Sequence, residues 1–262
     1  MKVLDNAERY LDDFLSNMRE KEVSTPQLSL SQLAQDLKKH DEFTGDTEDV
    51  LLLISSRRFT IHFVSKGFAL FSGYSQEEVM DFKPIHVFKS FKLDSLNYPL
   101  SAFLWNDGIK SNFNSPPIQH KTFSAGIECK RKDGEVYKLF IKQIGLEFDS
   151  KNNPTASLLR FKKINHLMKK DFFWMRVIEG EDGETKGFFT TKTGKTKYRD
   201  AFSNREMEVL RLLERNKNTK EISQLLGITT NTVEKHRKNM IARLGAKDST
   251  ALIQLCQMCE II

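Results

Sequence analysis

Residues Lys220–Gly245 read KEISQLLGITTNTVEKHRKNMIARLG, and this stretch decides the fold of the C-terminal part of the chain. An amphipathic run ends at Gly227-Ile228, and a longer run rich in lysine and arginine follows it. Glycine adopts the positive φ that a sharp turn between two helices requires. The stretch therefore predicts two helices joined by a tight turn, with the second helix cationic.

Helix start signals extend this pattern in both directions. The sequence contains two capping boxes, Ser203 with Glu206 and Asn218 with Glu221, and two further N-cap residues, Thr229 and Asp248. In a capping box the first side chain accepts from the backbone of the residue three positions later, whose carboxylate accepts in return. Four such signals at short intervals predict four short helices.

Apolar residues recur at helical spacing within three of these segments. The stripes are Val209, Leu210 and Leu213, then Ile222 and Leu226, then Val233, Met240 and Leu244. Ile228, directly after the turn glycine, is placed to fill the angle between the second and third helices. We therefore expect a small all-α domain with its own core.

The third helix has a polar face opposite its apolar stripe. Glu234, Lys235, Lys238 and Asn239 point away from the Val233–Leu244 stripe. Clustered cations bind phosphates through release of counterions, and lysine and asparagine also contact base edges. A merely solvated charged face is the usual explanation of such a run. Here the run follows a capped helix and a glycine turn, which favours a DNA-contacting helix.

The segment resembles the LuxR/FixJ (GerE-like) family over about 60 residues, through the strings SNREMEVLRLL, KEI, TVEKH and RLG. The resemblance implies that the third helix lies in the major groove. It further implies base contacts by Glu234, Lys235 and Lys238, and phosphate contacts by Lys220, Thr229, Thr232 and Arg237. His236 matches a family position and serves either packing or contact. Two residues depart from the pattern: Ser223 replaces an alanine, and Glu234 replaces a lysine. An acid at Glu234 would favour cytosine N4.

The middle of the chain has a different pattern. Val50–Ile54 and Phe59–Val64 are β-rich runs, and Ser75 with Glu78 forms another capping box. The Asp133-Gly134 turn between Phe123–Lys130 and Glu135–Ile144 predicts a hairpin, and Thr155–Phe161 is a last strand. This order of two strands, short helices and three antiparallel strands resembles a PAS domain, as does the string FTIHFVSKGFALFSGYSQEEV.

The PAS resemblance implies an interior that holds a ligand in many members. The photoreactive flavin subclass needs a cysteine in a helix motif, and none precedes Cys129. Haem would need a ligand such as His86 or His120. The many phenylalanines, among them Phe68, Phe71 and Phe82, would equally fill the interior. The cofactor is therefore unknown, and ligand sensing and a dry dimerisation module both stay open.

The sequence predicts an α+β protein whose four segments we delimit as residues 1–45, 46–168, 169–199 and 200–262. These are an N-terminal helical segment, a PAS-like sensor domain, a basic linker and a helix-turn-helix domain. Helical stripes at Leu4–Met18 and at Leu30–Leu37 cover the sheet or form a dimer contact. Lys186–Arg199 carries five cations and no acid, which favours a flexible arm.

Composition bounds the function further. The 262 residues carry a net charge of +6, which suits a nucleic-acid partner. No apolar run is long enough for a membrane span, and MKVLDNAERYLDDF does not resemble a signal peptide, so we expect a cytoplasmic protein. Three cysteines argue against a disulfide framework, and Cys256 and Cys259 either pack in the core or serve redox or metal chemistry.

These patterns together predict a sequence-specific DNA-binding transcription regulator whose PAS-like domain senses a signal or mediates dimerisation. The partners we expect are double-stranded DNA and a second copy of the chain, with RNA polymerase and a small PAS ligand as further candidates. No phosphate-binding loop, metal-ligand cluster or nucleophile elbow is apparent, so an enzyme is not expected. The alternative is a protein-interaction adaptor without specific DNA binding.

Overall fold

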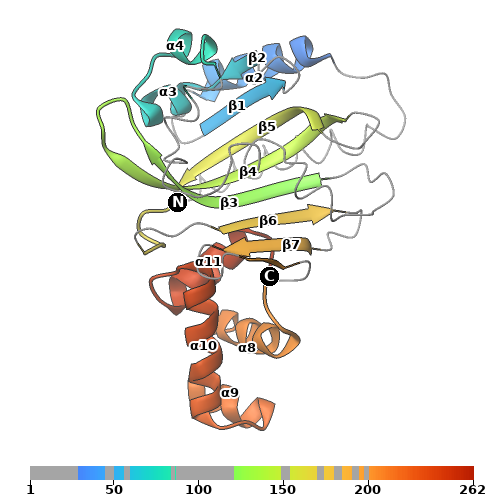
Figure 1. Cartoon of the computed structure of the whole chain (residues 1–262), viewed down its shortest axis with the longest axis vertical. Helices are drawn as coiled ribbons and strands as arrows, with labels where there is room; N and C mark the ends of the chain where they lie inside the picture. Colours follow the sequence, from blue (N-terminus) through green and yellow to red (C-terminus); the bar gives the residue numbers. More distant parts are fainter. Residues whose placement is uncertain are drawn as a thin grey trace.

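The computed structural model describes residues 29–44, 50–55, 60–83, 86, 121–148, 154–169, 174–179, 185–190, 195–197 and 201–262. Eight strands form one antiparallel sheet in the order β2-β1-β5-β4-β3-β6-β7-β8 (Figure 1). The strands are β1 Val50–Ser55, β2 Thr60–Val64, β3 Lys121–Lys130, β4 Val136–Phe148, β5 Pro154–Lys163, β6 Trp174–Glu179, β7 Thr185–Thr190 and β8 Lys195–Lys197. The helices are α2 Leu30–Thr44, α3 Lys66–Ser72, α4 Gln76–Met80, α8 Asn204–Glu214, α9 Thr219–Leu226, α10 Thr230–Leu244 and α11 Ser249–Met258. The protein is thus of the α+β class.

The first strand is buried on both faces, as its run of apolar residues requires. Leu52 and Ile54 pack on one face with Phe68 of α3 and Val79 of α4. The alternate residues of β1 face the other way, where they meet α2 through Leu33 and Leu37. Helices therefore cover both faces of this half of the sheet, and the expectation that the Leu30–Leu37 stripe covers the sheet is confirmed.

Short side chains fix the two helices beside the sheet. The Ser65 hydroxyl accepts from the backbone N–H of Phe68, which caps α3, and from Leu51 N–H at 2.9 Å. Ser75 forms the predicted capping box with Glu78 at the start of α4. Between the helices, Gly73 ends α3 with φ +76°, a conformation that favours glycine.

The predicted order of elements in this domain is confirmed. Two strands are followed by two short helices and three antiparallel strands, and the strands β1 to β5 take the order β2-β1-β5-β4-β3. The predicted hairpin at Asp133-Gly134 joins β3 to β4. The domain is therefore PAS-like. The stripe Leu4–Met18 lies outside the described residues, as do His120 and the segment 87–120.

The segment 169–199 differs from the expectation of a basic linker whose part Lys186–Arg199 is a flexible arm. It contains β6, β7 and β8, and β6 pairs with β3 from Lys121↔Glu179 to Gly126↔Trp174. These strands continue the sheet beyond the five strands of the PAS-like part. Strand β6 pairs with β3, which lies about fifty residues earlier, and β7 and β8 follow as its antiparallel neighbours. The local run of cations does not reveal the pairing of β6 with β3.

Four helices form the C-terminal domain, as predicted. Both capping boxes are present, at Ser203 and at Asn218, and Thr229 and Asp248 cap α10 and α11. The core contains the three predicted stripes, with Val209, Ile222, Val233, Met240 and Leu244 fully buried. None of the helices in the described ranges is long and apolar enough to cross a membrane.

Candidate nucleic-acid interface

The turn between α9 and α10 has the geometry that the sequence predicts. Gly227 takes the left-handed conformation with φ +62°, and its N–H contacts the carbonyl groups of Ser223 and Gln224. Ile228 N–H donates to Ser223 O at 3.0 Å, and the half-buried Ile228 side chain packs against the helical core. The turn therefore sets the direction in which α10 leaves α9.

Polar contacts hold the same two helices together on one side of this turn. Thr219 Oγ1 at the start of α9 donates to Glu234 Oε1 at 2.6 Å. Arg237 Nη1 donates to the same oxygen at 2.7 Å and to Thr219 Oγ1 at 2.9 Å. The hydrogen bond from Thr219, together with the charge of Arg237, lowers the pKa of Glu234 below its ordinary value. Its carboxylate is therefore charged and held against α9.

Arg237 also reaches the last helix. Its Nε and Nη2 donate to Ser249 Oγ at 3.1 Å and 2.8 Å. A single guanidinium thus connects α9, α10 and α11. A second arginine of α10 is internal as well: Arg243 donates to Ala201 O at 2.6 Å and to both oxygens of the buried Glu206. Two of the four cations of this helix therefore serve its own domain.

The remaining predicted site residues lie on the outer surface. Lys235, Lys238 and Asn239 are exposed on α10, and Lys220 and Thr229 are exposed near the turn. Thr232 is partly exposed, and its hydroxyl lies 2.9 Å from that of Thr229. His236 is half-buried. The structure thus separates the predicted set into an outward group and the partly exposed pair formed by Glu234 and Arg237, whose charged groups are bonded within the domain.

Sequence analysis missed one outward residue, Asn231. It is exposed, and it precedes Lys235 by four positions and Lys238 by seven. This spacing places all three on one face of a helix. The signal was present in the sequence, since the same period defines the apolar stripe, but our interpretation concentrated on the charged residues.

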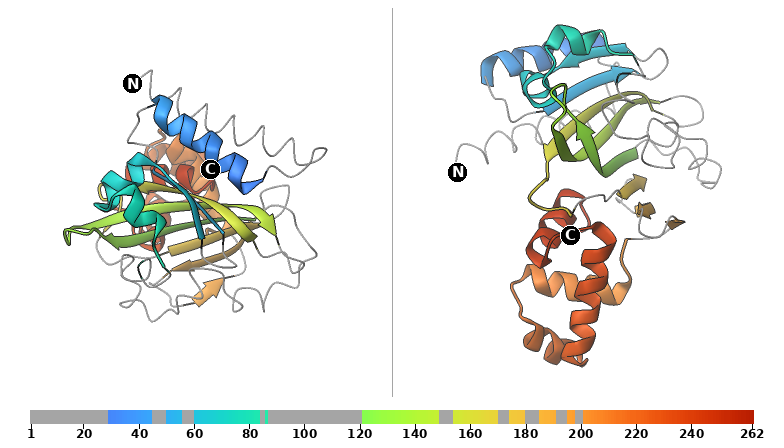
Figure 2. Two further views of the ribbon diagram at one scale, coloured as in Figure 1. Left: turned by 90° about the horizontal axis from the view of Figure 1, so that it is seen from above. Right: turned by 60° about the vertical axis from the view of Figure 1, so that its left-hand side comes forward.

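The outward group lies at one end of the molecule. In Figures 1 and 2, α9 and the first turns of α10 are the part of the C-terminal domain farthest from the sheet. The opposite end of α10, with α11, faces the sheet. The outer face of the first turns of α10 is therefore not covered by the sheet.

The sheet contacts the C-terminal domain through the loop between α10 and α11. Lys169 N–H donates to Gly245 O at 2.8 Å, and Lys247 N–H donates to Leu167 O at 2.9 Å. Phe140 of β4 and the segment Ile164–Met168 are part of the same apolar cluster as the helices. Lys142 of β4 forms an ion pair with Glu260. The junction thus combines backbone bonds, apolar packing and charge.

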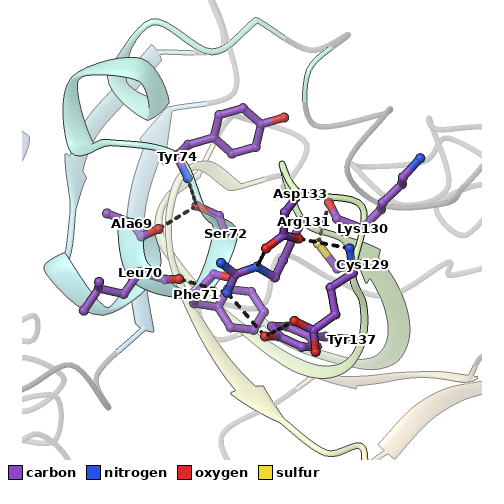
Figure 3. Close-up of polar contacts among 11 residues, drawn as sticks. Ala69, Leu70, Phe71, Ser72, Tyr74, Cys129, Lys130, Arg131, Asp133 and Tyr137 are labelled. Atoms are coloured by element: carbon purple, nitrogen blue, oxygen red, sulfur yellow. Dashed lines mark hydrogen bonds and ion pairs between the residues drawn. The ribbon is translucent and has the colours of Figure 1, made fainter.

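Within the PAS-like domain, the β3–β4 hairpin is fastened to the end of α3 (Figure 3). Arg131 Nη1 donates to the carbonyl groups of Leu70 and Phe71 at 3.2 Å and 3.3 Å and to the Tyr137 hydroxyl at 3.3 Å. Asp133 binds the Nε of the same guanidinium at 3.0 Å. The arginine therefore satisfies carbonyl groups at the end of a short helix and fixes that helix against the sheet.

The candidate cofactor and metal ligands that the structure describes are His86, Cys256 and Cys259. His86 is exposed and its Nδ1 accepts from Lys83 N–H at 2.9 Å. Cys256 and Cys259 are buried in the helical core and form no disulfide, and burial raises the pKa of the Cys129 thiol to about 12. Within the described part of the chain, no group of three histidine, cysteine or acidic side chains is close enough to hold a metal ion.

The comparisons with known proteins agree with the helix-turn-helix geometry. Residues 200–256 match the model of the family described as bacterial regulatory proteins, luxR family. The spore germination protein GerE of Bacillus subtilis is 43% identical over 58 residues, which are 22% of this chain and 78% of GerE. The transcriptional regulatory protein MctR of Rhizobium johnstonii is 40% identical over 55 residues, and the chain spans only 26% of its length.

Two solved structures are similar to a larger part of the chain. A VqmA–ligand–DNA complex of Vibrio cholerae covers 84% of this chain and 85% of its own, with 13% identity and a TM-score of 0.33. A PAS domain from a two-component sensor histidine kinase covers 50% of this chain and 97% of its own, with 11% identity and a TM-score of 0.33. Likenesses at this level carry no information about ligands or partners.

The turn, the caps and the outward lysines define the C-terminal domain as a helix-turn-helix of four helices, joined to a PAS-like domain. The chain belongs to the luxR family of bacterial regulatory proteins.

Proposed function

We propose that this chain is a sequence-specific DNA-binding transcription regulator that inserts the first turns of α10 into the major groove. The observation that carries the proposal is the group of outward side chains on these turns, at the end of the molecule away from the sheet. A helix presented by a preceding helix and a glycine turn suits the width of the major groove.

The outward residues divide by their chemistry. Lys235, Lys238 and Asn239 supply donors for base edges, while Lys220, Thr229 and Thr232 lie near the turn and suit phosphate oxygens. Glu234 and Arg237 have a different role in this proposal, because each is bonded to the other and to Thr219. They hold α10 at its angle to α9, and a cytosine contact by Glu234 is no longer part of the proposal.

The protein acts as a homodimer in this account. One recognition helix contacts only a few base pairs, which gives a small footprint. Two copies related by a twofold axis contact two half-sites in inverted orientation, so the DNA site is an inverted repeat.

The PAS-like domain controls how the helix-turn-helix domains are arranged. Strand β4 contributes Leu139 and Ile141 to the core beneath α3, and its intervening residue Phe140 packs against the C-terminal domain. One strand thus contacts both parts. A ligand or protein bound at the PAS-like domain regulates DNA binding only if it binds two arrangements of this junction with different affinity.

Selection of genomic DNA by the purified full-length protein tests the main proposal. Random genomic fragments are bound, recovered and sequenced. The expected result is enrichment of one motif with inverted symmetry. A protein-interaction adaptor, the alternative from the sequence, would enrich no motif, and that result would refute sequence-specific binding.

Native mass spectrometry of the same full-length protein tests the assembly. We expect a dimer. Extra mass that stays bound to the protein under gentle desolvation would identify the class of a ligand retained by the PAS-like domain. A monomer that stays monomeric when the enriched DNA is added would refute the homodimer.

A further inference from the structure

We propose that Asn231 selects an adenine in the DNA site, next to base pairs selected by Lys235 and Lys238. This inference rests on the proposed function, since it concerns how the same helix distinguishes sequences. It assigns to Asn231 a role that neither the sequence patterns nor the family resemblance indicates.

The three side chains form one stripe along α10. At 3.6 residues per turn, Lys235 lies about 40° round the helix from Asn231, and Lys238 lies about 20° from it. The seven residues from Asn231 to Lys238 span about 10 Å along the axis, which matches roughly three base-pair steps of about 3.4 Å. The stripe therefore has the length of a short half-site.

The Asn231 side chain does not stabilise the fold through a described contact. Its side chain is exposed, and within the described part of the chain it makes no hydrogen bond. Thr229 already caps the helix by accepting from Thr232 N–H at 3.1 Å, so an asparagine two positions later is not needed for capping. Its amide is therefore free to contact a ligand.

The chemistry of the stripe selects particular bases. An asparagine amide both donates and accepts, and it forms two hydrogen bonds with adenine N6 and N7. A lysine ammonium only donates, and it suits the O6 and N7 acceptors of guanine. Because the carboxylate of Glu234 is held by Thr219 and Arg237, it does not compete with these contacts. The half-site should therefore contain one adenine close to guanines.

Asn239 is the competing candidate for an adenine contact on the same helix, because we also place it among the residues that face the bases. It is an exposed asparagine like Asn231, but it lies eight positions further on, about 80° round the helix and about 12 Å along the axis. It therefore lies beside the stripe and toward the end of α10 that faces the sheet.

The test repeats the DNA selection with full-length Asn231→Ala, Asn231→Gln and Asn239→Ala proteins. Their far-UV circular dichroism is compared with that of the wild type, to establish that each is folded. For the wild type we expect an adenine preference at one half-site position. Asn231→Ala should reduce the discrimination at that position by roughly 5- to 150-fold, the range for a bidentate base contact. Asn231→Gln should retain an adenine preference, because glutamine forms the same pair of bonds.

The outcomes separate this inference from the function on which it rests. If the wild type enriches no motif, the proposed function fails. If it enriches a motif and Asn231→Ala keeps every base preference, sequence-specific binding stands and the role of Asn231 is refuted. Loss of the adenine preference in Asn239→Ala instead of Asn231→Ala would also refute it.

Discussion

Met168 and Ala246 pair in an isolated antiparallel β-bridge, which joins the end of the PAS-like domain to the loop between α10 and α11. Both residues are fully buried. The bridge lies at the opposite end of α10 from Asn231 and Lys235. In the proposed function, a change in the sheet would reach the end of α10 that contacts DNA through the length of this helix.

The apolar part of this junction should dominate its stability. Phe140→Ala removes a buried ring and should cost about 3–5 kcal/mol, while Lys142→Ala removes a partly exposed ion pair and should cost less than about 1 kcal/mol. Urea denaturation of the full-length chain, followed by far-UV circular dichroism, measures both. An equal loss of stability in the two variants would contradict this account, because it would show that the ion pair contributes as much as the apolar packing.

Arg237 should contribute to the stability of the C-terminal domain. Arg237→Ala removes hydrogen bonds to Thr219, Glu234 and Ser249, so the free energy of unfolding of the C-terminal domain should fall by about 1–3 kcal/mol. The exposed Lys235→Ala should change stability by less than about 0.5 kcal/mol. Thermal unfolding of the two variants compares them directly. Arg237→Ala with wild-type stability and weakened DNA binding would instead make Arg237 a phosphate contact, as the family resemblance implied.

Glu206 should make stability depend on pH in the acid range. Burial by itself would raise the pKa of Glu206, but hydrogen bonds from Arg243 and from Ser203 N–H lower it below the ordinary value. A lowered folded-state pKa means that the stabilisation is complete above the unfolded-state pKa of about 4.3 and is lost as the pH falls below it.

Urea titrations of the wild type and Glu206→Gln between pH 7 and pH 3 measure this effect. At pH 7 the glutamine variant should be less stable by about 1–3 kcal/mol, because Arg243 loses its buried charged partner. Below the pKa of the unfolded chain the difference should shrink. A difference that stays constant across the range would mean that the charge of Glu206 does not contribute.

Much of the C-terminal domain could be predicted from sequence because its signals are local. A capping box such as Ser203 with Glu206 spans four residues, and the structure forms it without help from distant parts of the chain. The turn at Gly227 is equally local, since it depends on one residue that accepts a positive φ. The hairpin at Asp133-Gly134 belongs to the same group.

Two further features, strand β6 and the hydrogen bond that holds Glu234, could not be predicted because they depend on contacts between distant segments. Strand β6 is part of the sheet because it pairs with β3, and the residues of β6 do not by themselves indicate which strand it pairs with. The position of the Glu234 carboxylate depends on its hydrogen bond with Thr219, which approaches only once the angle between α9 and α10 is set. The family resemblance therefore implied a DNA contact for Glu234 and Arg237, although both side chains are bonded within the domain.

The salt dependence of DNA binding tests the central claim most directly. The affinity of the full-length protein for its selected DNA is measured at several salt concentrations for the wild type, for Lys235→Ala with Lys238→Ala, and for a control with Lys162→Ala and Lys247→Ala. The control removes the same charge from exposed lysines of β5 and of the α10–α11 loop. We predict weaker binding by the first double variant and a slope of log affinity against log salt that is smaller by about two, with wild-type behaviour in the control. Unchanged affinity and slope in the Lys235 and Lys238 variant would contradict DNA binding through α10.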